Sequence, residues 1–90
     1  MFMNMATAEP LPGQRTELLK RMKTFADALR LMPGLVNVFV LTEEGTENLI
    51  GLSIWTDQAS FERGMASVPS LPDKVAVTKQ PPIVRHFTEV

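Results

Sequence analysis

Two short stretches carry the side chains with the clearest potential for chemistry. "IGLSIWTDQASFERGM", residues 50–65, holds Trp55, the one tryptophan of the chain, and Ser53 two positions before it. Near the other end of the chain lies His86, the one histidine, and imidazole is the side-chain type that changes charge near neutral pH. His86 is therefore a candidate base, with a structural or surface role as the alternative. Trp55 is either a core side chain whose N–H needs a partner or the wall of a binding site.

Several kinds of chemistry are excluded by what the 90 residues lack. There is no cysteine, and one histidine alone argues against a transition-metal site. "GLSIW" lacks the second glycine of a nucleophile elbow, and no glycine-rich loop is present to bind phosphate. A net charge of −1 gives nucleic acid no electrostatic reason to bind, and no apolar run is long enough to span a bilayer. We predict a soluble, cytoplasmic protein with no nucleic-acid or membrane partner.

The first half of the chain contains the clearest helix. Residues 2–8 are short, mostly apolar and followed by helix breakers, which predicts a strand. A helix is expected over about 14–31, with Arg30 in its last turn and Pro33 ending it. The positions that share its apolar stripe are Leu18, Met22, Phe25 and Leu29.

The second half predicts a hairpin, a helix and a last strand. Residues 35–41 and 47–55 form the two strands of the hairpin, and Gly45 lies in its loop. Thr56 or Asp57 caps a second helix, Pro69 ends it, and 69–82 is a long connection. Its apolar stripe is Phe61, Met65 and Val68. With a strand over 83–90, the order is β-α-β twice, which predicts one α+β domain over 1–90 with a ferredoxin-like fold and a four-stranded antiparallel sheet.

Both faces of the predicted hairpin are apolar. Alternation separates Ile50, Leu52 and Ile54 from Leu49, Gly51, Ser53 and Trp55, and it separates Val36, Val38 and Val40 from Leu35, Asn37, Phe39 and Leu41. Four strands make a sheet roughly 19 Å wide, which two helices of about 10 Å each cover on one face only. The other face needs a second copy of the chain, so we predict a homodimer through sheet faces.

Two stretches carry a resemblance to a known family. "PGQRTELLKRMKTFADALRLMPGLVNVFVL" and "IGLSIWTDQASFERGM" resemble the signature regions of antibiotic biosynthesis monooxygenase-type domains. The shared features are the Pro-Gly-Gln opening, the Met-Pro-Gly-Leu break, and the strand-end tryptophan before an Asp/Gln-rich helix start. The resemblance implies a dimeric α+β barrel built from ferredoxin-like protomers.

The resemblance also implies an activity and a place for the site. Members include oxygenases that need no cofactor and act on anthrone-like or quinol-like aromatics, and haem-degrading enzymes. Asn4 resembles the polar first-strand residue near the substrate, and the likeness places Trp55 toward the helices, where the pocket of active members lies. The chain has no tyrosine, which excludes a tyrosine-assisted mechanism, and Met65 stands where haem-degrading members carry a histidine, so haem degradation is not expected.

Two functional readings follow. The first is a monooxygenase that uses no cofactor, with Asn4, Trp55 and His86 as its catalytic residues around a small, electron-rich aromatic substrate. The second is a dimer without catalysis that binds a small apolar ligand or acts as a scaffold. The side chains predicted to contact the substrate are Met22, Phe25, Phe39, Ser53, Phe61 and Met65. An empty pocket lined by convergent polar groups would favour the first reading, and a pocket packed shut by Met22, Phe25, Phe61 and Met65 would favour the second.

Overall fold

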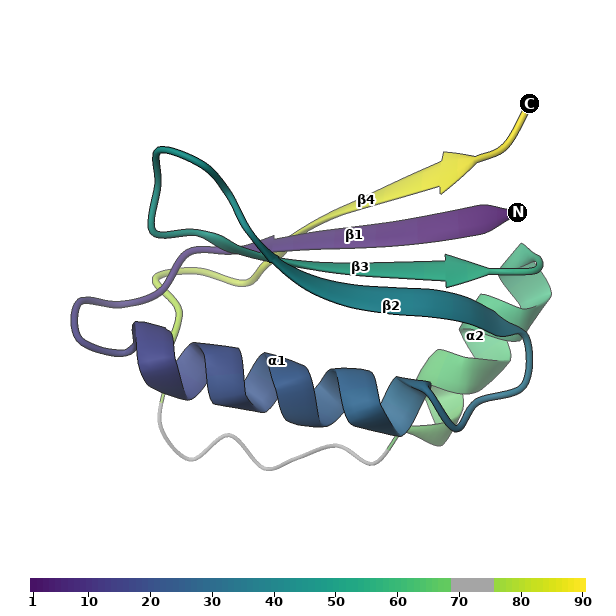
Figure 1. Cartoon of the computed structure of the whole chain (residues 1–90), viewed down its shortest axis with the longest axis horizontal. Helices are drawn as coiled ribbons and strands as arrows, with labels where there is room; N and C mark the ends of the chain where they lie inside the picture. Colours follow the sequence, from purple (N-terminus) through teal and green to yellow (C-terminus); the bar gives the residue numbers. More distant parts are fainter. Residues whose placement is uncertain (69–75) are drawn as a thin grey trace.

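The computed structural model of the chain describes residues 1–68 and 76–90. Strands and helices alternate in the order β-α-β-β-α-β, which confirms the predicted order (Figure 1). The elements are β1 (Phe2–Ala8), α1 (Arg15–Leu29), β2 (Leu35–Thr42), β3 (Leu49–Trp55), α2 (Gln58–Ser67) and β4 (Ile83–Thr88). No helix in this part of the chain has the length and apolar character needed to cross a membrane.

The four strands form one antiparallel sheet in the order β2-β3-β1-β4. Both helices lie on the same face of this sheet, and the two chain termini lie at the same end of it (Figure 1). The α+β, ferredoxin-like protomer predicted from the periodicity is confirmed. Of the connection predicted over 69–82, residues 69–75 lie outside the described residues.

The two helices begin in different ways. The carboxylate of Asp57 accepts a hydrogen bond of 2.7 Å from the backbone N–H of Ser60, so it caps α2. This backbone hydrogen bond, helped by the Ser60 side chain, holds the pKa of Asp57 below its ordinary value. At the start of α1, Gln14 makes no such side-chain bond. The helix ends at Leu29, and Arg30 follows it as the C-cap. The prediction that Arg30 lies within the last turn is therefore wrong.

Among the described residues, the buried apolar side chains between the sheet and the helices form two separate groups. The larger group, which we call the Trp55 cluster, is Phe2, Ala26, Leu29, Val38 and Trp55. The smaller group, the Leu49 cluster, is Ala8, Leu18, Leu49 and Val77. Trp55 and Leu49, both on the helix side of β3, are fully buried.

The strand faces follow the predicted alternation except at the start of β2. Leu49, Ser53 and Trp55 face the helices, as expected. The pairing of β2 with β3 shifts between Leu35 and Asn37, so Leu35 lies opposite Trp55 and packs against its cluster. The prediction that Leu35 shares a face with Asn37 is therefore wrong. An extra residue in one strand reverses the alternation beyond it, and a simple period of two does not anticipate that.

Candidate functional site

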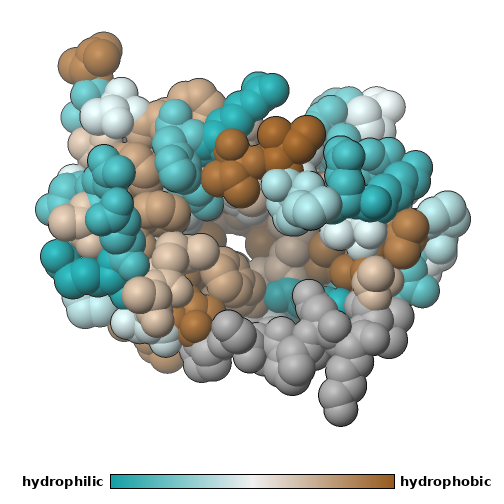
Figure 2. All heavy atoms as spheres, turned by 180° about the vertical axis from the view of Figure 1, so that it is seen from behind, coloured by the Kyte–Doolittle hydropathy of each residue, from teal (hydrophilic) through white to brown (hydrophobic). Residues whose placement is uncertain are grey.

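A cavity of about 850 Å³ lies between α1 and the helix-facing side of the sheet. This volume is within the range of about 300–1,000 Å³ that small-molecule sites occupy. Figure 2 shows the molecule hollowed near its centre, with mostly apolar side chains around the opening. The residues that line the cavity come from β1, α1, β2, β3, α2 and the segment 76–82.

The cavity exists because small residues meet across two strands. Ala6 of β1 lies directly opposite Gly51 of β3, and both line the cavity. A methyl group placed on Gly51 would meet only the Cε of Met22, at 3.6 Å. At this pair of positions β1 and β3 therefore offer no side chain large enough to fill the space under α1.

Asn4 is a lining residue that carries an unsatisfied polar atom. It lines the cavity from β1, and its Oδ1 is buried with no hydrogen-bond partner. Leaving a buried acceptor unpaired costs about 1–3 kcal/mol, so such atoms are rare in proteins unless a ligand or water completes them. Asn4 is thus the lining residue with the strongest need for a ligand.

Ser53 lies directly opposite Asn4 in the pairing of β1 with β3. Its side chain is buried, lines the cavity and accepts a hydrogen bond of 2.9 Å from the indole Nε1–H of Trp55. The indole itself is fully buried in its cluster and is not among the lining residues. Trp55 thus packs in the core and reaches the cavity only through Ser53.

His86 and Phe61 belong to an aromatic group outside the cavity lining. The ring of His86 lies 5.1 Å from that of Phe2 and 5.4 Å from that of Phe61, centroid to centroid. Phe61 in turn contacts Trp55 edge-on, at 5.9 Å. His86 is the partner of Asn4 in the pairing of β1 with β4, so it adjoins the site without lining it.

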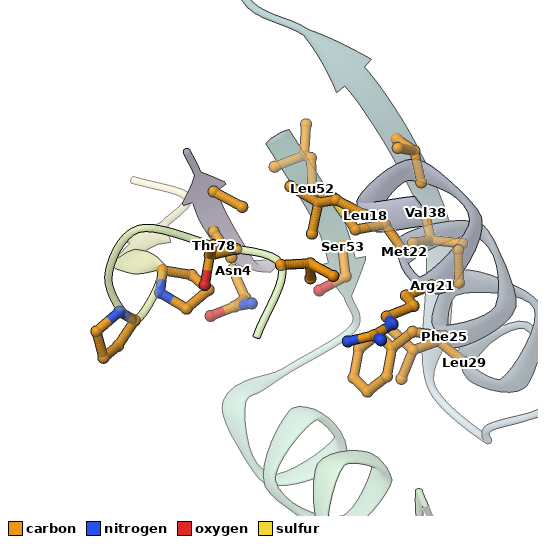
Figure 3. Close-up of a pocket in the computed structure, with 18 of the residues that line it drawn as sticks. Asn4, Leu18, Arg21, Met22, Phe25, Leu29, Val38, Leu52, Ser53 and Thr78 are labelled. Carbon is orange, nitrogen blue, oxygen red and sulfur yellow. The ribbon is translucent and has the colours of Figure 1, made fainter. Parts of the chain in front are cut away.

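Of the other side chains predicted to contact a substrate, Met22, Phe25 and Met65 line the cavity. They leave a cavity of about 850 Å³ open, so they do not pack it shut. Figure 3 shows Met22 and Phe25 on the α1 side of this space. The lining of the cavity also includes Phe39. Its place opposite Leu52 in the register, however, directs its side chain to the outer face of the sheet, where Phe39 is 40% exposed.

Two cationic residues at the cavity escaped the sequence-based prediction. Among the described residues, the charged ones that line the cavity are Arg21 of α1 and Lys79 of the segment 76–82. Arg21 pairs with Glu17 at 3.3 Å and Lys79 with Glu9 at 3.0 Å. Arg21 lies next to Met22 of the predicted stripe, which was a usable signal. Across the described residues, no group of three or more His, Cys, Asp or Glu could hold a metal ion.

Lys79 belongs to a segment that forms backbone hydrogen bonds with residues 9–11, which follow β1. The N–H of Leu11 donates to the carbonyl of Val77 at 2.9 Å, and the N–H of Lys79 donates to that of Glu9 at 3.0 Å. Thr78 also bridges to Pro10. These bonds hold residues 76–82 as one wall of the cavity.

Comparison with solved structures supports the fold. The protein Rv0793 from Mycobacterium tuberculosis superposes with a TM-score of 0.84 at 14% identity, covering 99% of this chain and 94% of that one. A structure described as an antibiotic biosynthesis monooxygenase gives 0.83 at 16% identity, covering 100% and 99%. The haem-degrader MhuD from Mycobacterium tuberculosis, with two haems bound, gives 0.75 at 20% identity, covering 100% and 96%. No curated protein matches the chain.

The sequence itself matches a family. The model of the family described as antibiotic biosynthesis monooxygenase matches residues 1–69, which run from β1 through α2 and include Asn4, Ser53 and Trp55. The match covers well over half of the chain. This protein therefore belongs to the antibiotic biosynthesis monooxygenase family.

Proposed function

We propose that the cavity binds a small, electron-rich hydroxylated aromatic and that the protein catalyses its oxygenation without a cofactor. The observation that carries the proposal is the unpartnered Oδ1 of Asn4 in a cavity walled mainly by apolar side chains. A phenol or enol hydroxyl would donate to this oxygen, while its rings would pack against Phe25 and Met22. The family and its monooxygenase member support this reading.

From the protein, this oxygenation requires only a few polar groups and a pocket that excludes water. In an anthrone-type substrate the reactive CH2 tautomerises to an enol, whose ionised form is electron-rich enough to react with O2 directly. One oxygen atom becomes the new ring C=O, and the other leaves as water with the two hydrogens of the CH2. Asn4 would favour the enol by accepting its O–H, and the apolar walls would keep water from the intermediates.

Haem is a poorer candidate substrate for this chain. MhuD, which has a similar fold, is described as a haem-degrader, so haem is a second substrate to compare with the hydroxylated aromatic. The lining includes Asn4 and Met65, and neither residue can supply an imidazole. The one histidine of the chain, His86, packs on Phe2 and Phe61. An imidazole that could hold haem iron is therefore absent from the described lining of the cavity.

Oxygen uptake tests the proposal. We would supply anthrones and dihydroxynaphthalenes with no cofactor and compare the wild type with Asn4→Leu, which keeps the side-chain size and removes the acceptor. Loss of one hydrogen bond worth about 1.4 kcal/mol predicts an uptake about tenfold slower. Thr7→Val is the matched control, because Thr7 lies on β1 but on the opposite face. Ligand binding without uptake by the wild type would support a binding module without catalysis instead.

His86 is the proposed base, and a separate variant tests it. It lies beside Asn4 across β1 and β4 and is the one imidazole of the chain. His86→Gln should slow uptake and leave ligand affinity unchanged, because it removes proton transfer and no lining contact. Unchanged uptake would contradict the role of His86 as the base.

We also propose that the protein is a homodimer through the outer face of the sheet. This face carries exposed apolar side chains, namely Phe39, Leu41, Ile83 and Phe87. Large exposed apolar patches are typical of protein–protein contacts. Leu41→Glu should yield monomers in sedimentation experiments. Leu31→Glu is the control, since Leu31 is 84% exposed at the end of α1 and away from the sheet. A monomeric wild type would contradict the proposal.

A further inference from the structure

A buried hydrogen bond connects the core to the cavity through Ser53. The indole Nε1–H of Trp55 donates to the Ser53 Oγ, and both residues are almost completely shielded from solvent, at 0% and 3% exposure. The Trp55 side chain has no other polar atom. Ser53, in contrast, is both a partner of the indole and a lining residue of the cavity.

The hydrogen bond from Trp55 determines which hydrogen-bonding capacity of the Ser53 hydroxyl remains unused. A hydroxyl group has one proton to donate and two lone pairs to accept with. The indole takes one lone pair, and among the described residues the hydroxyl proton forms no hydrogen bond with an acceptor. A hydroxyl group that accepts one hydrogen bond also becomes a stronger donor, because hydrogen bonds in a chain polarise one another. The Ser53 hydroxyl is therefore a donor available at the cavity.

Asn4 places an acceptor beside that donor. The two residues are direct partners in the pairing of β1 with β3, and such partners have Cβ atoms about 4.5–5.5 Å apart. The Asn4 Oδ1 is the buried acceptor with no partner. Figure 3 shows both side chains projecting from neighbouring strands into the cavity, with Phe25 and Arg21 of α1 across from them.

We propose that Ser53 determines specificity as a hydrogen-bond donor and that, with Asn4, it selects aromatics bearing oxygens on neighbouring ring carbons. One oxygen donates its proton to the Asn4 Oδ1, and its neighbour accepts a proton from the Ser53 Oγ. Trp55 is a positioning residue that holds the hydroxyl for this contact. The inference rests on the proposed function in that the ligand is a hydroxylated aromatic.

The geometry gives a direct comparison between isomers. In 2,3-dihydroxynaphthalene the two oxygens are neighbours and reach both side chains together, whereas in 2,7-dihydroxynaphthalene they lie on different rings and only one is in reach. The isomers have the same atoms and rings, so their apolar contribution is nearly equal. One additional hydrogen bond predicts about tenfold tighter binding of the 2,3 isomer.

Calorimetric titration under nitrogen measures binding without oxygenation. We expect Ser53→Ala to bind the two isomers equally, because the 2,3 isomer loses its additional hydrogen bond, and Ser53→Thr to restore the selectivity. Trp55→Phe should reduce the selectivity in part, because it keeps Ser53 but removes the indole donor. Ser60→Ala is the matched control, since Ser60 is also a buried serine but lies in α2 outside the cavity lining.

The outcomes separate this inference from the proposed function. Equal binding of the two isomers by the wild type, or selectivity retained in Ser53→Ala, would overturn the role of Ser53 and leave the proposed function standing. If the wild type binds neither isomer and also takes up no oxygen with any anthrone, both the inference and the proposed function are overturned.

Discussion

Two glycines face the layer between the sheet and the helices, and their surroundings differ. A methyl group on Gly64 of α2 would lie 2.5 Å from the Cη2 of Trp55 and 2.7 Å from its Cζ3. On Gly51 of β3 it would meet nothing closer than 3.6 Å. The same layer is thus filled to contact at the Trp55 cluster and open at the cavity.

The difference separates a packed end of this layer from an open end. At the closed end, the ring of Trp55 occupies the space that a side chain on Gly64 would need. Phe61 contacts both this ring and the ring of Phe2. At the open end, the facing residues Ala6 and Gly51 are both small, and no neighbour compensates. Ser53 lies at the boundary and belongs to both, since it holds the indole and faces the cavity.

Removing the ring at the closed end should have the largest effect. Trp55→Ala deletes a fully buried side chain, for which a loss of about 3–5 kcal/mol in the free energy of unfolding is typical. Met65→Ala, which trims a half-exposed residue at the cavity, should cost much less. Urea unfolding followed by circular dichroism measures both. Similar losses would contradict the division between a packed end and an open one.

Adding a methyl group at the closed end should be the next largest change. Gly64→Ala overpacks a rigid ring, at a cost of about 1–3 kcal/mol, while alanine returns roughly 1 kcal/mol of helix propensity. We therefore expect a net loss of about 1 kcal/mol, which lowers the melting temperature of a domain of this size by about 4–8 °C. An increase in melting temperature would mean that the ring moves to make room.

The same methyl group at the open end should have a small effect of opposite sign. Gly51→Ala restricts the unfolded chain and meets only ordinary contact with Met22, so a gain of about 0.4–1 kcal/mol is expected. Thermal unfolding of this variant beside Gly64→Ala is the direct test of the comparison. A loss in Gly51→Ala would show that the space is not open.

The sequence predicted the closed end better than the open one. Helical stripes such as Leu18 to Leu29 reveal which side of a helix is buried, and strand alternation placed Trp55 and Ser53 on the same face, as the structure confirms. Leu35 was missed because one shift in register reverses a face. These are local properties of the chain.

The cavity depends on pairings between distant segments. Ala6 and Gly51, or Asn4 and Ser53, become neighbours only when β1 pairs with β3 in one register. A glycine inside a strand was still a usable sign of empty space or close approach. The unpartnered state of the Asn4 oxygen, however, depends on every group around it, and no sequence pattern reports that.

The smallest predicted effect concerns the cap of α2, the helix that closes the Trp55 end. The backbone N–H of Ser60 lowers the pKa of Asp57, so the charged carboxylate stabilises the folded state above its unfolded pKa. That contribution is lost as the pH falls through the lowered pKa. Asp57→Asn keeps a capping oxygen without the charge, so its melting temperature should lie slightly below that of the wild type at neutral pH and converge with it in acid. A difference that stays constant down to about pH 2 would rule out the charge as its cause. Because Gln14 makes no side-chain cap on α1, Gln14→Asn gives a matched variant in which any gain or loss should show no such acid dependence.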